Sequence, residues 1–286
     1  MDGITGLARL PQRFNRVSLV ILSVFLLLTV SSFAQTPGPS QAPIQAPSID
    51  EKSQKIIDAA VAALGGQAYL NVQSVVGKGF YSDFKDGAPQ VPSKFTDYVI
   101  YPNRERTDVT LSGIKTIQTN DGETGWTFDG NVKKISDQKP AQIEEFKRTM
   151  RASVENILRG WWRKESGTVK YIGRREAGLA KRNETIRLTY PDGFWIEYEF
   201  GAKDGMPAKV IYKRMRKDMD LAEMVETTEE DYLRSYVNIE GINAPWVIDH
   251  FVNGKQTSRI NYESVQYNQK IPDTLFVKPD NVKAIK

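Results

Sequence analysis

Apolar residues recur at helical spacing in the segment that follows Ser48. Ser48 and Glu51 have the spacing of a capping box. In this motif the serine side chain accepts from a free backbone amide of the first turn, and the glutamate side chain accepts from the serine amide. Gly65-Gly66 supplies the left-handed exit that commonly ends a helix. The pattern predicts a helix between these two signals, with its apolar face formed by Ile56, Ile57, Ala60, Val61 and Leu64.

A second helical pattern runs from Ala141 to Trp162. Charged residues occupy one side of this segment, so the other side must lie on an apolar surface. We expect that surface to be the inner face of a sheet. Adjacent helical residues diverge by about 100°, so only one of Trp161 and Trp162 can face the core squarely. The apolar positions step by three or four residues: Ile143, Phe146, Met150, Val154, Ile157, Leu158 and Trp161.

The remainder of the sequence after Leu70 consists of short β-rich segments separated by turn dipeptides. Their connections are too short for crossover helices, so the predicted sheet is antiparallel. About eleven or twelve strands with two principal helices predict an α+β, mainly β fold, in which a single strongly curved sheet wraps around the helices. The predicted strands are 75–84, 94–101, 104–111, 114–119, 125–128, 169–175, 184–190, 194–200, 208–215, 224–237, 245–252 and 256–266.

The first 34 residues have the features of an export signal. Arg9, Arg13 and Arg16 precede an apolar run from Val17 to Val30, and Ser32 and Ala34 are small residues at the cleavage-determining positions. We expect cleavage after Ala34 and a periplasmic domain; the alternative is an uncleaved inner-membrane anchor. Residues 35–47 are rich in proline and predict a disordered linker, and residues 48–286 form the predicted domain.

Composition narrows the chemistry of the exported domain. The chain has no cysteine, which excludes disulfides, thiolate metal sites and an acyl-thioether anchor. The net charge is +4, of which 3 − 1 = +2 belongs to residues 1–34, so about +2 remains for the rest. A nearly neutral exported domain gives no indication of nucleic-acid binding.

The sequence lacks the residue combinations that are typical of enzyme active sites. His250 is the single histidine, so a multi-histidine zinc site is excluded and a catalytic triad would need His250 itself. Its apolar surroundings favour a hydrogen-bonded structural role. Asp218-Met219-Asp220 has too few oxygen ligands for a divalent ion. We therefore expect a protein that is not an enzyme and needs no metal or cofactor.

Two charge runs remain as possible contact surfaces. Charged rims are the ordinary interpretation, and contact of the basic run with phospholipid headgroups or a partner protein is the specific one. The acidic run contains Glu226, Glu229, Glu230 and Asp231, and the basic run contains Lys209, Lys213, Arg214, Arg216 and Lys217.

Four segments resemble the LolA/LolB-like outer-membrane lipoprotein-sorting proteins. They are IIDAAVAALGGQAYLNVQSVVGKGF, DGETGWTFDG, YVNIEGINAPWVIDHFVNGK and NYESVQYNQKIPDTLFVKP, and together they span nearly the whole predicted domain. The resemblance implies a half-barrel of antiparallel strands closed by helices, with an apolar cavity that takes acyl chains. None of the four segments is a catalytic fingerprint.

Large apolar side chains are the candidates to line such a cavity. On the strand 194–200 the even positions point inward, which makes Trp195 a weak candidate; Trp246, Ile248 and His250 share one face of their strand. Core packing remains an alternative role for each candidate. The candidates are Ile143, Phe146, Met150, Val154, Ile157, Trp161, Trp126, Phe200, Trp246 and Ile248.

The function that these features favour is a monomeric periplasmic carrier or chaperone for a lipid or lipidated protein. Its free energy of binding would come from burial of apolar ligand surface. Two alternatives stay open: an envelope sensor or scaffold that binds a protein partner through its rim, and a hydrolase that depends on His250.

Overall fold

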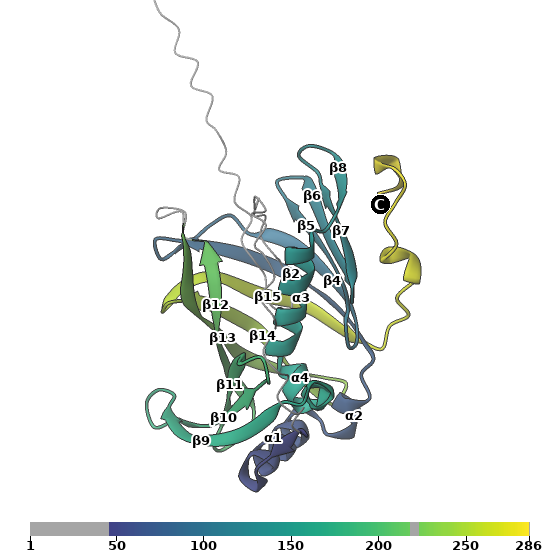
Figure 1. Ribbon diagram of the computed structural model, residues 1–286. Coiled ribbons are helices and arrows are strands. Elements are labelled where there is room, and N and C mark those ends of the chain that lie inside the picture. The colour runs from purple at the N-terminus through teal and green to yellow at the C-terminus, as the bar shows by residue number, and fades with distance from the viewer. Residues whose placement is uncertain (1–45, 218–222, 286) are drawn as a thin grey trace, which may run out of the picture.

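The computed structural model describes residues 46–217 and 223–285, which form one strongly curved sheet with helices on its concave side (Figure 1). The helices are α1 (Glu51–Leu64), α2 (Gln67–Leu70), α3 (Pro140–Ala152), α4 (Val154–Leu158) and the 3₁₀ turns η1 (Trp161–Glu165), η2 (Asp273–Leu275) and η3 (Val282–Ala284). The strands are β1 (Ser48–Ile49), β2 (Ser74–Lys85), β3 (Ala88–Pro89), β4 (Ser93–Ile100), β5 (Arg104–Leu111), β6 (Ile114–Asp121), β7 (Thr124–Asp129), β8 (Lys134–Asp137), β9 (Thr168–Glu176), β10 (Arg182–Thr189), β11 (Trp195–Gly201), β12 (Pro207–Lys217), β13 (Met224–Ile239), β14 (Ile242–Val252) and β15 (Lys255–Tyr267).

The strand order is β1-β9-β10-β11-β12-β13-β14-β15-β2-β4-β5-β6-β7-β8, with β3 paired to β2. The described residues thus contain 15 strands, three more than the twelve ranges predicted. The additional strands β1, β3 and β8 have two to four residues, too few to produce an alternating pattern. The prediction of a purely antiparallel sheet was wrong at one edge, because β1 pairs with β9 in parallel.

The start of α1 differs from the predicted cap. Asp50, rather than Ser48, is the N-cap, and its carboxylate accepts hydrogen bonds from the Ser53 amide (2.8 Å) and the Tyr171 amide (2.6 Å). Ser48 lies in β1 instead. The shared acceptor therefore fixes the start of α1 to strand β9. The predicted exit is confirmed, since Gly65 ends α1 at φ 122°.

The single helix predicted from Ala141 to Trp162 is two helices followed by a 3₁₀ turn. Ser153, at ψ 150°, ends α3 and caps α4, and its Oγ accepts from the Asn156 amide at 3.1 Å. A serine hydroxyl can replace helical backbone bonds in this way, a competition that apolar spacing does not reveal. Gly160 then adopts the left-handed conformation before η1. Of the tryptophan pair, Trp162 is fully buried and Trp161 is half-buried.

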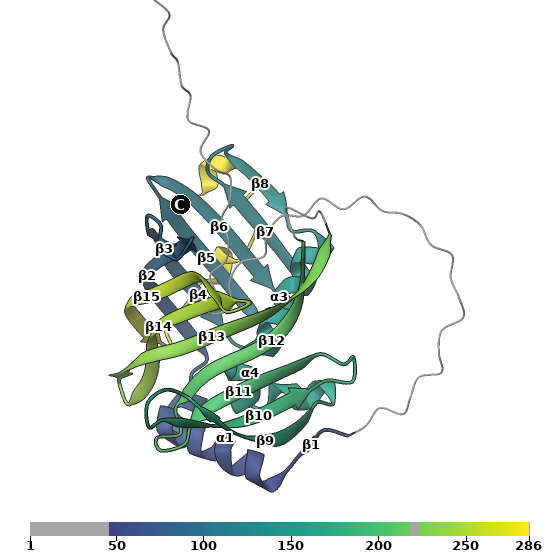
Figure 2. The same ribbon diagram turned by 90° about the vertical axis from the view of Figure 1, so that its left-hand side faces the viewer.

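The largest apolar core lies where α1 and α4 cover β9 to β12 (Figure 2). The predicted alternation on β11 is confirmed, because Ile196, Tyr198 and Phe200 are each at most 1% exposed and belong to this core. Trp195 lies on the other face, beneath the Arg187 guanidinium at 4.7 Å from the ring centre. These contacts fix the lower part of the half-barrel.

The C-terminal segment covers the face of β5 to β7 that is turned away from α3 (Figure 1). Trp126 Nε1 donates to the Phe276 carbonyl at 2.8 Å, and Arg106 Nη1 donates to the Leu275 carbonyl at 2.9 Å. This part of the sheet is therefore covered on both faces.

The predicted signal segment and residues 35–45 of the predicted linker lie outside the described residues. Within the described ranges, no helix combines the length and apolar character needed to cross a bilayer.

Candidate functional site

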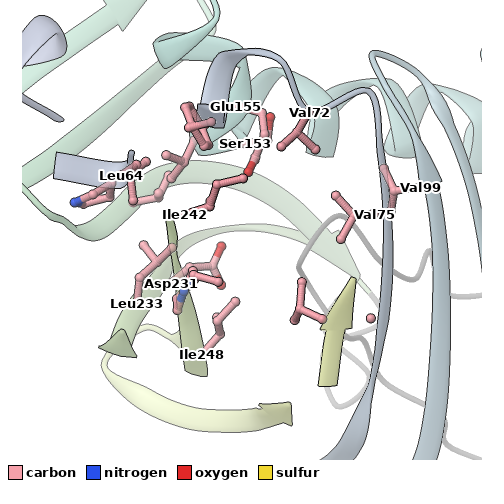
Figure 3. Close-up of a pocket in the computed structure, with 18 of the residues that line it drawn as sticks. Leu64, Val72, Val75, Val99, Ser153, Glu155, Asp231, Leu233, Ile242 and Ile248 are labelled. Carbon is pink, nitrogen blue, oxygen red and sulfur yellow. The ribbon is translucent and has the colours of Figure 1, made fainter. Parts of the chain in front are cut away.

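A cavity of about 140 Å³ lies between the concave face of the sheet and the junction of α3 with α4. Figure 3 shows Ser153 and Glu155 on one side of the space, with Leu233 and Ile248 across from them. Its apolar lining includes Leu64, Val72, Val75, Val99, Met150, Val154, Val210, Leu233, Ile242, Ile248 and Val265. Tyrosine rings complete the wall: Tyr69, Tyr101, Tyr212, Tyr236, Tyr262 and Tyr267.

The volume defines what this conformation can hold. It equals roughly ten water-sized spheres, and an apolar cavity of this order, about 150 Å³, takes a benzene-sized molecule. A short alkyl segment fits this space. A longer chain requires the covering helices to move away from the sheet.

The break between α3 and α4 is held by the core beneath it. Tyr198 Oη donates to the Arg151 and Ser153 carbonyls at 3.1 and 3.2 Å. Asn156 Nδ2 donates to the same Arg151 carbonyl at 2.7 Å and to Tyr190 Oη at 2.6 Å. The side chains satisfy carbonyls that a continuous helix would have used. The break therefore places the last turn of α3 and the first turn of α4 over the cavity.

Arg159 closes the cavity next to α2. Its guanidinium donates to the carbonyls of Tyr69 (2.8 Å), Leu70 (3.1 Å) and Val72 (3.0 Å). It also lies 4.8 and 4.5 Å from the ring centres of Tyr69 and Tyr101. The Arg159 side chain thus connects the end of α4 with the α2 turn and with Tyr101, the residue that follows β4.

Carboxylates interrupt the apolar lining. Glu155 is half-buried on α4, and burial raises its pKa although the charge of Arg159 opposes the shift. Asp97 on β4 is 4% exposed, and burial raises its pKa well above the ordinary range. Among the described residues, neither side chain has a salt bridge to a lysine or arginine. The wall therefore combines apolar surface with acids that favour their neutral form.

Three of the sequence candidates meet at this cavity, namely Met150, Val154 and Ile248. Ile157 and Phe200 belong to the largest core, while Ile143 and Phe146 are buried beneath α3 away from the cavity lining. The remaining candidates are the tryptophans. The ring centre of Trp161 lies 5.5 Å from that of Tyr101 in a tilted pair, and that of Trp246 lies 6.4 Å from that of Tyr262. Trp126 packs under the C-terminal segment on the opposite face of the sheet.

The tyrosines and acids of the wall were absent from the sequence candidates. Alternation on β4 carries a usable signal, since Phe95, Asp97 and Val99 fall on one face. An acid between two apolar inward positions indicates a polar site in the core. The tyrosines of the cavity wall carry no comparable signal, because they come from elements that are distant in sequence.

His250 is hydrogen-bonded, as expected from the sequence. Its Nδ1 lies 2.6 Å from Asp231 and its Nε2 lies 2.8 Å from Glu229. Burial alone would lower the pKa of His250, but the charge and hydrogen bonds of the two acids raise it to about 9. Glu229 also pairs with Arg216, and these hydrogen bonds hold its pKa at about 2 despite burial. Both ring nitrogens are occupied, so the imidazolium joins β13 to β14.

The two charge runs pair with each other across β12 and β13. Lys209 contacts Glu230 and Lys213 contacts Glu226. Arg214 turns inward and pairs with Glu145 of α3 at 2.5 Å. Much of the basic run is therefore engaged within the sheet or with the covering helix.

Solved structures share this architecture, whereas no family model and no curated protein matches the chain. A DUF1329 family protein from Desulfovibrio piger superposes with a TM-score of 0.53 at 11% identity, over 79% of this chain and 97% of that one. A LolA superfamily protein from Nitrosomonas europaea gives 0.50 at 13% identity, again over 79% and 97%. The half-barrel fold of LolA-like proteins is thereby confirmed for this chain; at such identities the comparison establishes the fold.

Proposed function

We propose that this protein is an exported periplasmic carrier that shields acyl chains of a lipid or lipidated protein between its sheet and α3–α4. The observation that supports the proposal is the apolar cavity at the helix junction. The LolA-like fold is consistent with it. Export by cleavage after Ala34, a monomeric state and contact with the membrane surface belong to the same proposal.

The binding energy would come from burial of the ligand's alkyl groups, at about 0.8 kcal/mol for each methylene. Entry of a long chain would require α3 to swing away from the sheet. Ser153 offers a pivot, because its extended backbone already separates α3 from α4. Loading would then leave α4 in the core and change the position of α3.

A charged side chain at the cavity tests this proposal. Met150 lines the cavity, and Met150→Arg fills part of the cavity with a longer, charged side chain. We expect the full chain to bind a neutral naphthyl fluorophore and Met150→Arg to lose that binding by at least about tenfold.

Met215 provides the matched control. It is 51% exposed on β12, so Met215→Arg makes the same chemical change outside the cavity and should bind the fluorophore as the native protein does. Thermal unfolding of both variants separates lost binding from lost folding. Native-like binding by a folded Met150→Arg variant contradicts the carrier proposal.

A further inference from the structure

Buried polar side chains extend from the cavity wall along the inner face of β4 to β6. Asp97, Glu105 and Asn120 are 4%, 3% and 2% exposed. Asp97 is paired in register with Thr107, and Glu105 with Asn120. Glu105 is also opposite Val99, so it lies diagonally next to Asp97 on the same face. The cavity wall at Asp97 and Val99 therefore adjoins a second carboxyl group.

The acceptors of these side chains outnumber the donors around them. No side chain makes a well-aligned hydrogen bond to the carboxylate oxygens of Asp97 or Glu105 or to Asn120 Oδ1, and the Thr107 hydroxyl between the two acids lowers the pKa of each. Gln138 Nε2 donates to the Thr119 carbonyl at 3.1 Å, which leaves its Oε1 without a partner as well. Buried acceptors are normally satisfied, so this concentration of acceptors suits a ligand that carries several donors.

Gly125 lets the two amide side chains pack closely against the backbone. A Cβ atom at position 125 would lie 2.6 Å from the Thr119 carbonyl oxygen, 2.8 Å from Gln138 Cδ and 3.0 Å from Asn120 Oδ1. Any larger residue would therefore displace the amides or the backbone. On the cavity side, a Cβ atom at Gly77 would lie 2.9 Å from the Tyr262 ring, which places that ring over the backbone opposite Asp97.

A bound cation would stabilise the ionised forms of Asp97 and Glu105, which burial disfavours. Burial raises the pKa of Glu105 well above the ordinary range, and the charge of Asp97 raises it further. Burial likewise raises the pKa of Tyr262, with Asp97 and Glu105 adding to the shift. The two arginines that flank Glu105 on β5 point to the opposite face, where Arg104 pairs with Asp121 at 2.7 Å and Arg106 with Asp108 at 2.6 Å. The two inner acids have no cationic partner among the described residues.

We propose that Asp97 and Glu105 bind the primary ammonium group of an amphiphile whose alkyl chain occupies the cavity. This inference rests on the proposed carrier function. An ammonium group has three N–H donors and no acceptor, which complements a site made of carboxylate and amide oxygens. The nearby tyrosine rings add a surface that attracts a cation. A fatty-acid carboxylate has neither a positive charge nor an N–H donor to offer these acids.

A headgroup series on one chain length tests the site. Dodecylammonium, dodecanol and dodecanoate each compete with a neutral naphthyl fluorophore for the full chain at neutral pH. We expect dodecylammonium to bind at least about tenfold more tightly than dodecanol, and dodecanoate to bind most weakly. Equal displacement by all three overturns the ammonium site and leaves the carrier intact. No displacement by any of them overturns the carrier proposal and this inference with it.

Single-residue variants test whether Asp97 and Glu105 cause the preference for the ammonium headgroup. Asp97→Asn and Glu105→Gln should each reduce the ratio of ammonium to alcohol affinity toward one while dodecanol still binds. Glu263→Gln is the matched control, because Glu263 is an exposed carboxylate next to Tyr262 in sequence. It removes the same charge and should keep the native ratio.

Glu105 keeps the test independent of the cavity's shape, since it adjoins the lining without forming part of it. If Asp97→Asn does not fold, Glu105→Gln alone decides. A folded Glu105→Gln variant that retains the full ammonium preference refutes the proposal.

Discussion

Replacement of Arg159 by alanine should loosen the α2 end of the half-barrel. The guanidinium makes three hydrogen bonds to backbone carbonyls, at 2.8, 3.0 and 3.1 Å. Hydrogen bonds from a charged group contribute about 1.5–3 kcal/mol each. Their simple sum overstates the loss, because one side chain makes all three and the carbonyls next to the cavity can be rehydrated. We expect a net loss of about 3 kcal/mol in the free energy of unfolding.

Calorimetric unfolding measures this loss. For a domain of this size, 1 kcal/mol corresponds to roughly 2–4 °C, so Arg159→Ala should lower the Tm by roughly 6–12 °C. Arg159→Lys should recover little, since an ammonium group cannot bridge the three carbonyls with a planar fork. Arg182→Ala, which removes an arginine that is 62% exposed, serves as the control and should change the Tm little. An unchanged Tm in Arg159→Ala would refute the structural role assigned to the guanidinium.

Three further predictions follow from other features. In an alcohol series from octanol to dodecanol, affinity should rise roughly 15-fold for every two methylenes until the space is filled; equilibrium displacement measures it, and a flat series contradicts apolar burial. Folded His250 keeps its proton up to a pKa of about 9, while the unfolded form releases it near the ordinary histidine pKa of 6.5. The unfolded state therefore binds fewer protons in between, and this histidine's contribution to stability should fall by about 3 kcal/mol as the pH rises from 6.5 to 9. Urea unfolding at both pH values, with His250→Asn as reference, checks that sign; a native protein that gains stability relative to the variant disproves it. Gly65→Ala should destabilise by at least about 2 kcal/mol more than Gly87→Ala, because both have positive φ but the Cβ of the former would lie 2.4 Å from the Gly241 carbonyl oxygen. Equal urea midpoints for the two variants would contradict that steric argument.

The alternating strands were predictable because each had enough residues for the two-residue period to stand out. On β11, the pattern also gave the correct inward face. β1 and β3 have only two residues each, so their pairing depends on the approach of distant chain segments. The break at Ser153 escaped prediction because the apolar spacing continues through it.

The cavity was harder to predict than the sheet. Met150, Val154 and Ile248 line it, and these were reachable from amphipathic spacing. Trp126 has equally strong apolar character, yet it lies on the other face because the C-terminal segment covers it. Sequence spacing identifies buried positions, whereas the layer that buries each one depends on the tertiary arrangement.

Bound ligand in the native protein tests the central claim most directly. The full chain is expressed, recovered without detergent and examined by native mass spectrometry, followed by organic extraction. The carrier account predicts additional mass on the folded protein that organic solvent releases as an acyl-chain compound, and loss of that mass in Met150→Arg but not in Met215→Arg. Folded native protein that carries no such compound, together with no binding of added alkyl ligands, would contradict the account.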